Sequence, residues 1–82
     1  MQTSFSNSVL LAIFYMTSDT LRVTRATLAQ RLGVRTTQVE AQLEGLERRG
    51  LIDARQLRLT FPGLAVAASL RSRGVTIARA AA

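Results

Sequence analysis

Three glycines that stand at the ends of helical patterns, each followed by an apolar residue, constrain this fold most. They occur in Gly33-Val34, Gly50-Leu51 and Gly74-Val75. In a Schellman motif, glycine takes the left-handed position just past a helix, and the next residue packs back on the last turn. The predicted contacts are Val34 with Ala29, Leu51 with Leu46, and Val75 with Leu70. Three helices are therefore expected to end at these glycines.

The starts of the first two helices are marked by hydroxyl residues. Thr24 is a predicted N-cap, because Val23 before it and Leu28 after it have the spacing of a hydrophobic staple. The helix that follows is expected over about residues 25–32. Ser6 is expected to cap the first helix in the same way.

The third and fourth helices also have recognisable starts. Thr37 and Glu40 have the spacing of a capping box, and Thr36 is an alternative cap one residue earlier. The third helix is therefore predicted over about residues 37–49. Pro62 is typical of a first helical turn and indicates a fourth helix that reaches about Arg73.

Two short strands are predicted between the third and fourth helices. Residues 51–53 and 57–61 flank a polar link of residues 54–56, and the second piece alternates apolar and polar side chains as a half-buried strand does. Residues 21–23 are also strand-like and lie where a third strand could pair with this hairpin. The expected fold is mainly α with a small β-hairpin.

The predicted order is helix, short strand, helix, tight turn, helix, hairpin and helix. This order is the layout of a winged helix-turn-helix domain, with a three-helix core, a hairpin wing and a C-terminal helix. Residues 1–82 are expected to form one such domain, with a core over about residues 5–73. The tail of residues 74–82 has no cap and no periodicity, so it is expected to be flexible or to lie at a dimer interface.

Several segments in this order resemble a known family. Residues 28–34, 36–39 and 46–52 are similar to the helix-turn-helix of MarR-type bacterial transcription regulators, and Leu59-Thr60-Phe61-Pro62-Gly63 resembles their step from wing to final helix. The resemblance covers about residues 21–70. It implies a transcription regulator that binds double-stranded DNA.

The resemblance also implies which residues contact DNA. In such domains, the third helix enters the major groove with its N-terminal residues facing the bases, while the wing contacts the backbone. The positions that would face the groove are Arg35, Thr36, Thr37, Gln38, Ala41 and Gln42. Arg25, Arg55 and Arg58 would contact phosphates.

The charge of the chain agrees with a polyanionic partner. The formal net charge is +6, and all eleven basic residues are arginine. A GC-rich genome would also favour arginine over lysine, so charge alone does not decide for nucleic acid.

With no cysteine and no histidine, the chain has no disulfide, no soft metal ligand and no nucleophile with a base beside it in the pattern. We therefore expect no enzyme, no metal and no cofactor.

Residues 9–16 form the longest uninterrupted apolar run. The run is far shorter than the roughly 20 residues that cross a bilayer, and no basic residue precedes Arg22 as in a secretory leader, so a cytoplasmic location is expected. The run is apolar on all sides, which suggests a homodimer through the first and fourth helices, although an unusually central helix would have the same pattern. The expected interface residues are Val9, Leu10, Ile13, Phe14, Leu64, Val66 and Leu70.

A second function class remains open because of the charge on the third helix. Residues 36–47 include Glu40, Glu44 and Glu47 but no basic residue, and carboxylates are repelled by phosphates. The alternative is a winged-helix protein-interaction module that binds a protein partner through this acidic helix without reading DNA.

Overall fold

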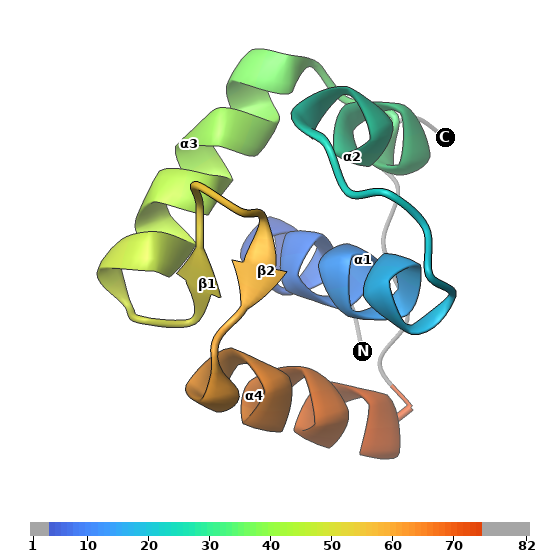
Figure 1. The fold of residues 1–82 in the computed structure, drawn as a ribbon, viewed down its shortest axis with the longest axis vertical. Coiled ribbons are helices and arrows are strands. Elements are labelled where there is room, and N and C mark those ends of the chain that lie inside the picture. The colour runs from blue at the N-terminus through green and yellow to red at the C-terminus, as the bar shows by residue number, and fades with distance from the viewer. Residues whose placement is uncertain (1–3, 75–82) are drawn as a thin grey trace.

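The chain folds around its first helix. The computed structural model describes residues 4–74, and in Figure 1 helix α1 lies between the pair α2 and α3 on one side and α4 on the other. A hairpin of β1 and β2 stands beside α1 and joins α3 to α4. The elements of the described part are α1 (Phe5–Ser18), α2 (Arg25–Leu32), α3 (Thr36–Arg48), β1 (Ile52–Asp53), β2 (Arg58–Leu59) and α4 (Phe61–Ser72). This part of the chain is thus mainly helical, with a small antiparallel sheet.

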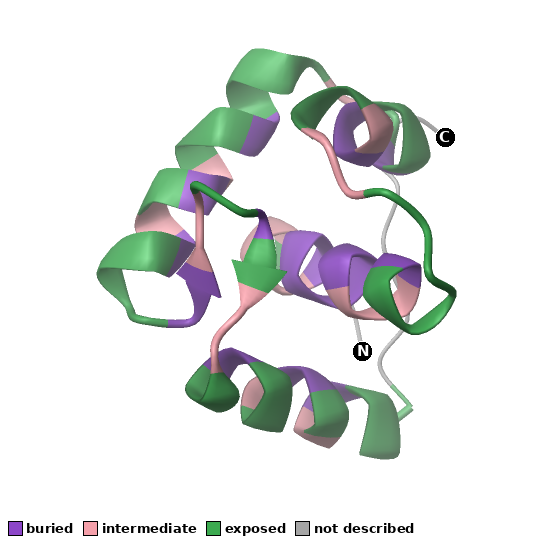
Figure 2. Cartoon of the chain, in the orientation of Figure 1, coloured by how far each residue is buried: buried purple, intermediate pink, exposed green. Residues whose placement is uncertain are grey.

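The central position of α1 explains why it is apolar on all sides. It packs against α2, α3, α4 and β2, and its middle residues are fully buried, as the purple segments of Figure 2 show. The expectation that Val9, Leu10 and Ile13 meet a second subunit is therefore wrong, because each is 0% exposed within one protomer. Leu70 on α4 is also buried in the core.

Three members of the expected interface set remain accessible. Phe14 and Val66 are half-buried, and Leu64 is 42% exposed. The pattern of residues 9–16 thus reflects a central helix and is no argument for a dimer. A dimer through these three residues stays a prediction.

Two of the predicted glycine stops are confirmed. Gly33 and Gly50 both have left-handed backbone conformations, with φ of 70° and 74°. The Val34 N–H donates to the Ala29 carbonyl at 3.0 Å, and the Leu51 N–H donates to the Leu46 carbonyl at 3.0 Å. These are the long Schellman bonds that the sequence predicts. Gly74 has the same conformation, but its partner Val75 lies outside the described residues.

Helix α1 ends in the same way without a glycine. Thr20 takes a positive φ of 57°, and the Leu21 N–H donates to the Met16 carbonyl at 2.8 Å. The Thr20 hydroxyl also donates to the Asp19 carbonyl at 2.6 Å. No glycine marks this turn, so its geometry could not be predicted from the residue types.

The helix starts agree only in part with the sequence. Thr24 caps α2 as predicted, and its side chain accepts from the Thr27 N–H at 3.0 Å. The prediction for Ser6 is wrong, because Ser4 is the N-cap of α1. For α3 the N-cap is Arg35, so neither Thr36 nor Thr37 has that role. Arginine carries no acceptor, and the capping bond comes from Gln38, whose Oε1 accepts from the Arg35 N–H at 3.0 Å.

The hairpin is shorter than predicted. Ile52 pairs with Leu59, and Asp53 pairs with Arg58. The predicted strand over residues 57–61 ends early, because Thr60 is the N-cap of α4 and Phe61 is its first residue. Among the described residues, residues 21–23 form no strand and do not extend the sheet.

Close packing fixes the step from β2 into α4. The Thr60 side chain accepts from the Gly63 N–H at 3.1 Å and donates to the Gly50 carbonyl at 2.6 Å. A Cβ at Gly63 would overlap with the Leu51 carbonyl oxygen, so only glycine allows this approach. These contacts give a physical reason for the Leu-Thr-x-x-Gly pattern.

Within residues 4–74, none of the helices has the length and apolar content that a membrane crossing needs.

Candidate nucleic-acid interface

The Arg25 side chain connects three elements on one exposed face. It extends from the first residue of α2, and its Nε lies 3.2 Å from Glu40 Oε1 on α3. Its Nη2 donates to the Ala54 carbonyl at the hairpin tip, at 3.5 Å. The start of α2, the outer face of α3 and the hairpin tip therefore meet at one guanidinium group.

The hairpin tip is also held by carboxylates. Glu47 Oε2 on α3 accepts from the Ala54 N–H at 3.1 Å, and Asp53 Oδ1 accepts from the Arg55 N–H at 3.0 Å. Leu57 closes the turn with a φ of 52° and buries its side chain. The backbone of the hairpin tip is therefore hydrogen-bonded to these carboxylates, while the side chains of Arg55 and Arg58 remain exposed.

The N-terminal half of α3 presents most of the predicted groove-facing residues to solvent. Its apolar stripe of Val39, Leu43 and Leu46 is buried against the core, so the opposite side of the helix is free. Figure 2 shows this outer side of α3 as exposed. The exposed predicted residues are Arg35, Thr36, Thr37, Gln38 and Ala41.

The placement of Gln42 on this outer face is wrong. Gln42 is half-buried, and its Oε1 accepts a hydrogen bond from the Ser6 hydroxyl of α1 at 2.5 Å. Its side chain thus connects two helices inside the protomer. The six predicted positions reach further around the helix than its exposed face. Gln42 therefore lies at the boundary between the exposed face and the side that packs on α1.

Gln38 is exposed but partly engaged. Bidentate pairing with adenine uses both the oxygen and the nitrogen of a side-chain amide. In Gln38, the oxygen already accepts from the Arg35 N–H. As placed, Gln38 offers its amide nitrogen to a partner, so Thr36 and Thr37 are the less constrained polar groups at this end of the helix.

Two of the three glutamates on α3 have partners inside the fold. Glu40 pairs with Arg25, and Glu47 accepts from the hairpin backbone. Glu44 is exposed and has no ion pair within the described part of the chain. Glu40 is therefore paired with an opposite charge, whereas Glu44 and Glu47 both keep their negative charge, with Glu47 turned to the hairpin backbone.

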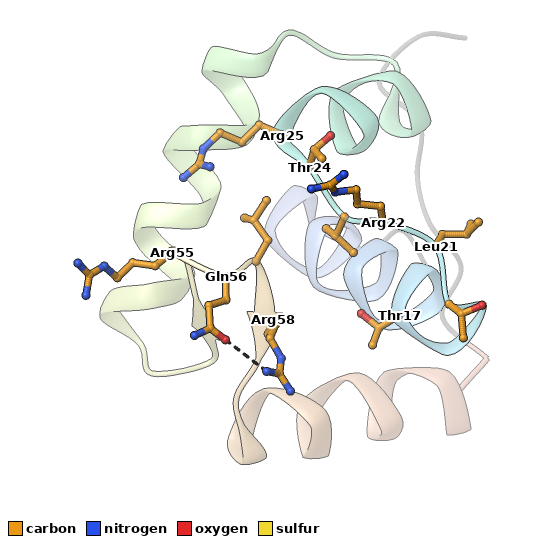
Figure 3. A pocket seen from close by; sticks show the side chains of 11 residues that line it. Thr17, Leu21, Arg22, Thr24, Arg25, Arg55, Gln56 and Arg58 are labelled. Atoms are coloured by element: carbon orange, nitrogen blue, oxygen red, sulfur yellow. Dashed lines mark hydrogen bonds between the residues drawn. The ribbon is translucent and has the colours of Figure 1, made fainter.

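A groove runs between the segment that leads into α2 and the hairpin, and Figure 3 shows it from close by. We call it the arginine groove. It has a volume of about 590 Å³, and residues 21–25 line one side while residues 55–58 line the other. Its described lining includes Arg22, Arg25, Arg55 and Arg58.

Arg22 is the one arginine of the groove's described lining that was not among the predicted phosphate contacts. It is exposed and stands between Leu21 and Val23. The alternation of apolar and polar residues at 21–23 does not predict this exposure, because Leu21 is itself 48% exposed. Its position opposite the hairpin depends on the path of the loop, which the sequence did not reveal.

The comparisons with known proteins add no relative. No protein-family model, no curated protein and no solved structure matches the chain. In the part of the chain that the structure describes, no group of three or more carboxylates could hold a metal ion. The interpretation of the site therefore depends on its own geometry and charge.

Proposed function

We propose that this chain is a winged helix-turn-helix domain that binds double-stranded DNA as a transcription regulator of the MarR-like kind. Helix α3 would enter the major groove, and the hairpin would act as the wing on the backbone. The observation that carries the proposal is the contact set of Arg25, which joins the start of α2, the outer face of α3 and the hairpin tip on one exposed face.

The chemistry of this face fits the two tasks of a DNA-binding surface. Base reading needs short donors and acceptors at the exposed start of a helix, and Thr36 and Thr37 supply them there. Backbone binding needs cations on both sides of that helix, since phosphate contacts set the register of the protein on the duplex. Arg25, Arg55 and Arg58 supply them.

A second candidate function has its own observation. Phe61 is 89% exposed at the start of α4, and Leu64 one turn later is 42% exposed. Exposed apolar side chains of this size are common at protein interfaces. Together with the outward Glu44, they favour a protein-interaction module as the alternative.

Titration of a labelled duplex by fluorescence anisotropy, at several salt concentrations, would test the main proposal. Binding driven by arginine releases condensed cations, so log K is expected to fall with log salt at about 0.9 per phosphate neutralised. We expect measurable binding at low salt and a steep decline. A flat response, or no binding at low salt, would favour the protein-interaction module.

A further inference from the structure

We propose that the arginine groove binds successive phosphates of a DNA strand and that Arg22 is one of its phosphate contacts. The inference rests on the proposed function, places the three predicted phosphate contacts Arg25, Arg55 and Arg58 on one groove, and adds Arg22 to them. The groove exists because residues 21–23 do not pair with β2. A third strand there would fill the space between the two segments.

The lining has the chemistry of a phosphate site. The described lining contains Arg22, Arg25, Arg55 and Arg58 and no carboxylate. Guanidinium groups form charge-assisted hydrogen bonds with phosphate oxygens. The Thr17 hydroxyl and the Gln56 amide nitrogen add further donors. An anion in this groove would therefore find donors and a local positive potential.

The arrangement of the arginines favours a linear polyanion. In Figure 3, Arg22 extends from the segment before α2 into the space between α2 and the hairpin, Arg58 extends from β2 toward α4, and Arg25 and Arg55 extend outward over α3. The four guanidinium groups lie apart and do not converge on one point. A single small anion needs convergent donors, whereas a chain of phosphates needs charges at intervals. The spread of these four groups therefore matches a nucleic-acid backbone.

The start of α2 adds to the potential at the rim of the groove. Thr24 and Arg25 line the groove at this helix N-terminus, where the helix dipole favours negative charge. The first turn of α2 contains no acidic residue that would occupy the position of a phosphate.

Arg22 is the most available cation of the set. Arg25 is paired with Glu40, and the Arg58 Nη1 donates to Gln56 Oε1 at 3.3 Å. Arg22 is exposed and has no ion pair among the described residues. A phosphate at Arg22 therefore displaces no carboxylate, and the contact would contribute directly to affinity.

Arg22→Gln, compared with Arg71→Gln, tests this contact. Arg71 is exposed on α4, on the far side of α1 from α2, so the two variants remove the same charge from different surfaces. We expect Arg22→Gln to weaken binding about tenfold on all duplexes alike and to reduce the salt slope by about one. Arg71→Gln is expected to stay within about twofold of the parent. Equal effects of both variants would overturn the proposal, because they would reflect net charge alone.

An NMR titration of the ¹⁵N-labelled chain with a mixed-sequence duplex separates this inference from the proposed function. We expect amide shifts both at residues 22–24 and 55–58, which line the groove, and at residues 36–38, at the start of α3. Shifts at the α3 residues alone would overturn the groove and leave the proposed function standing. Shifts at the groove residues alone would support the groove and contradict base reading by α3. An absence of shifts at both sets would overturn both proposals.

Inorganic phosphate in the same titration tests the shape argument. Because the arginines do not converge, we expect phosphate alone to bind the groove only at millimolar concentration. Saturation of the groove amides by micromolar phosphate would show a convergent small-anion site and would overturn the assignment to a strand of DNA.

Discussion

Arg25 on α2 and Glu40 on α3 form an ion pair with Nε and Oε1 3.2 Å apart, in the middle of the face proposed to meet DNA. Their side chains are 44% and 55% exposed, and an ion pair with this exposure contributes only about 0–1 kcal/mol to stability. A DNA phosphate would compete with Glu40 for the same guanidinium group. The pair therefore holds Arg25 in position in the free protein and lowers its availability to DNA.

Replacing Glu40 with Gln is predicted to strengthen DNA binding. The change removes a repelled carboxylate and also frees Arg25, so we expect a gain on all sequences with a steeper salt slope. Glu44→Gln is the matched comparison, since it removes the same charge from α3 without releasing an arginine, and its gain should be smaller. Anisotropy titrations would measure both, and thermal unfolding should change by no more than about 1 kcal/mol.

Two outcomes would count against this prediction. Weaker binding of Glu40→Gln would mean that Glu40 positions Arg25 for DNA or itself contacts a base. Weaker hold of a protein partner by Glu44→Gln, with DNA binding unchanged, would support the protein-interaction module.

The hairpin arginines are predicted to contribute affinity without specificity. Arg55→Gln and Arg58→Gln should each weaken binding on preferred and random duplexes alike and reduce the salt slope by about one. Neither side chain packs in the core, so folding should be preserved. Competition titrations with the preferred and the random duplex would show whether the affinity falls equally on both. Loss of preference for one sequence would assign base contacts to the hairpin instead.

Thr37 on α3 is predicted to contribute to base reading. Thr37→Ala should cost about 1–3 kcal/mol on the preferred site and less on random DNA. Gln42→Ala serves as the control, because Gln42 bonds to Ser6 inside the protomer and should affect stability but not sequence preference. If Thr37→Ala binds both duplexes like the parent protein, the assignment of α3 as recognition helix is wrong.

The helix ends were predictable where a local rule determines them. Gly33 and Gly50 occupy left-handed positions that favour glycine, and Thr24 caps α2 through bonds that span only three residues. These features depend on neighbours in sequence, so the sequence contains them. The end of α1 at Thr20 lacked such a signal, because a threonine adopts the left-handed conformation there.

Features that depend on tertiary contacts were less predictable. The apolar residues 9–16 fit either a central helix or a dimer surface, and only the positions of α2, α3 and α4 around α1 decide for the first. The inward position of Gln42 depends on Ser6, which is 36 residues away in sequence. The arginine groove likewise depends on the failure of residues 21–23 to pair with β2.

A homodimer through the remaining accessible apolar residues is a separate prediction. Leu64 is 42% exposed on α4, and Phe14 and Val66 are half-buried. Sedimentation equilibrium at micromolar concentration should show a dimer, and Leu64→Asp should shift it to monomer because a carboxylate would be buried without a partner. A parent protein that is monomeric across this range would contradict the prediction.

Gly63 and Gly45 are predicted to respond oppositely to alanine. At Gly63, a Cβ would overlap with the Leu51 carbonyl oxygen, so Gly63→Ala must push α4 away from the turn before β1. We expect a loss of about 1–3 kcal/mol, the usual cost of overpacking. Gly45 lies within α3 with nothing within 4 Å of the added Cβ, so Gly45→Ala should stabilise the helix by about 0.5–1 kcal/mol. Urea unfolding of the two variants would measure both changes. A Gly63→Ala variant as stable as the parent would contradict the prediction, because it would mean that α4 can move away from Leu51 at little cost.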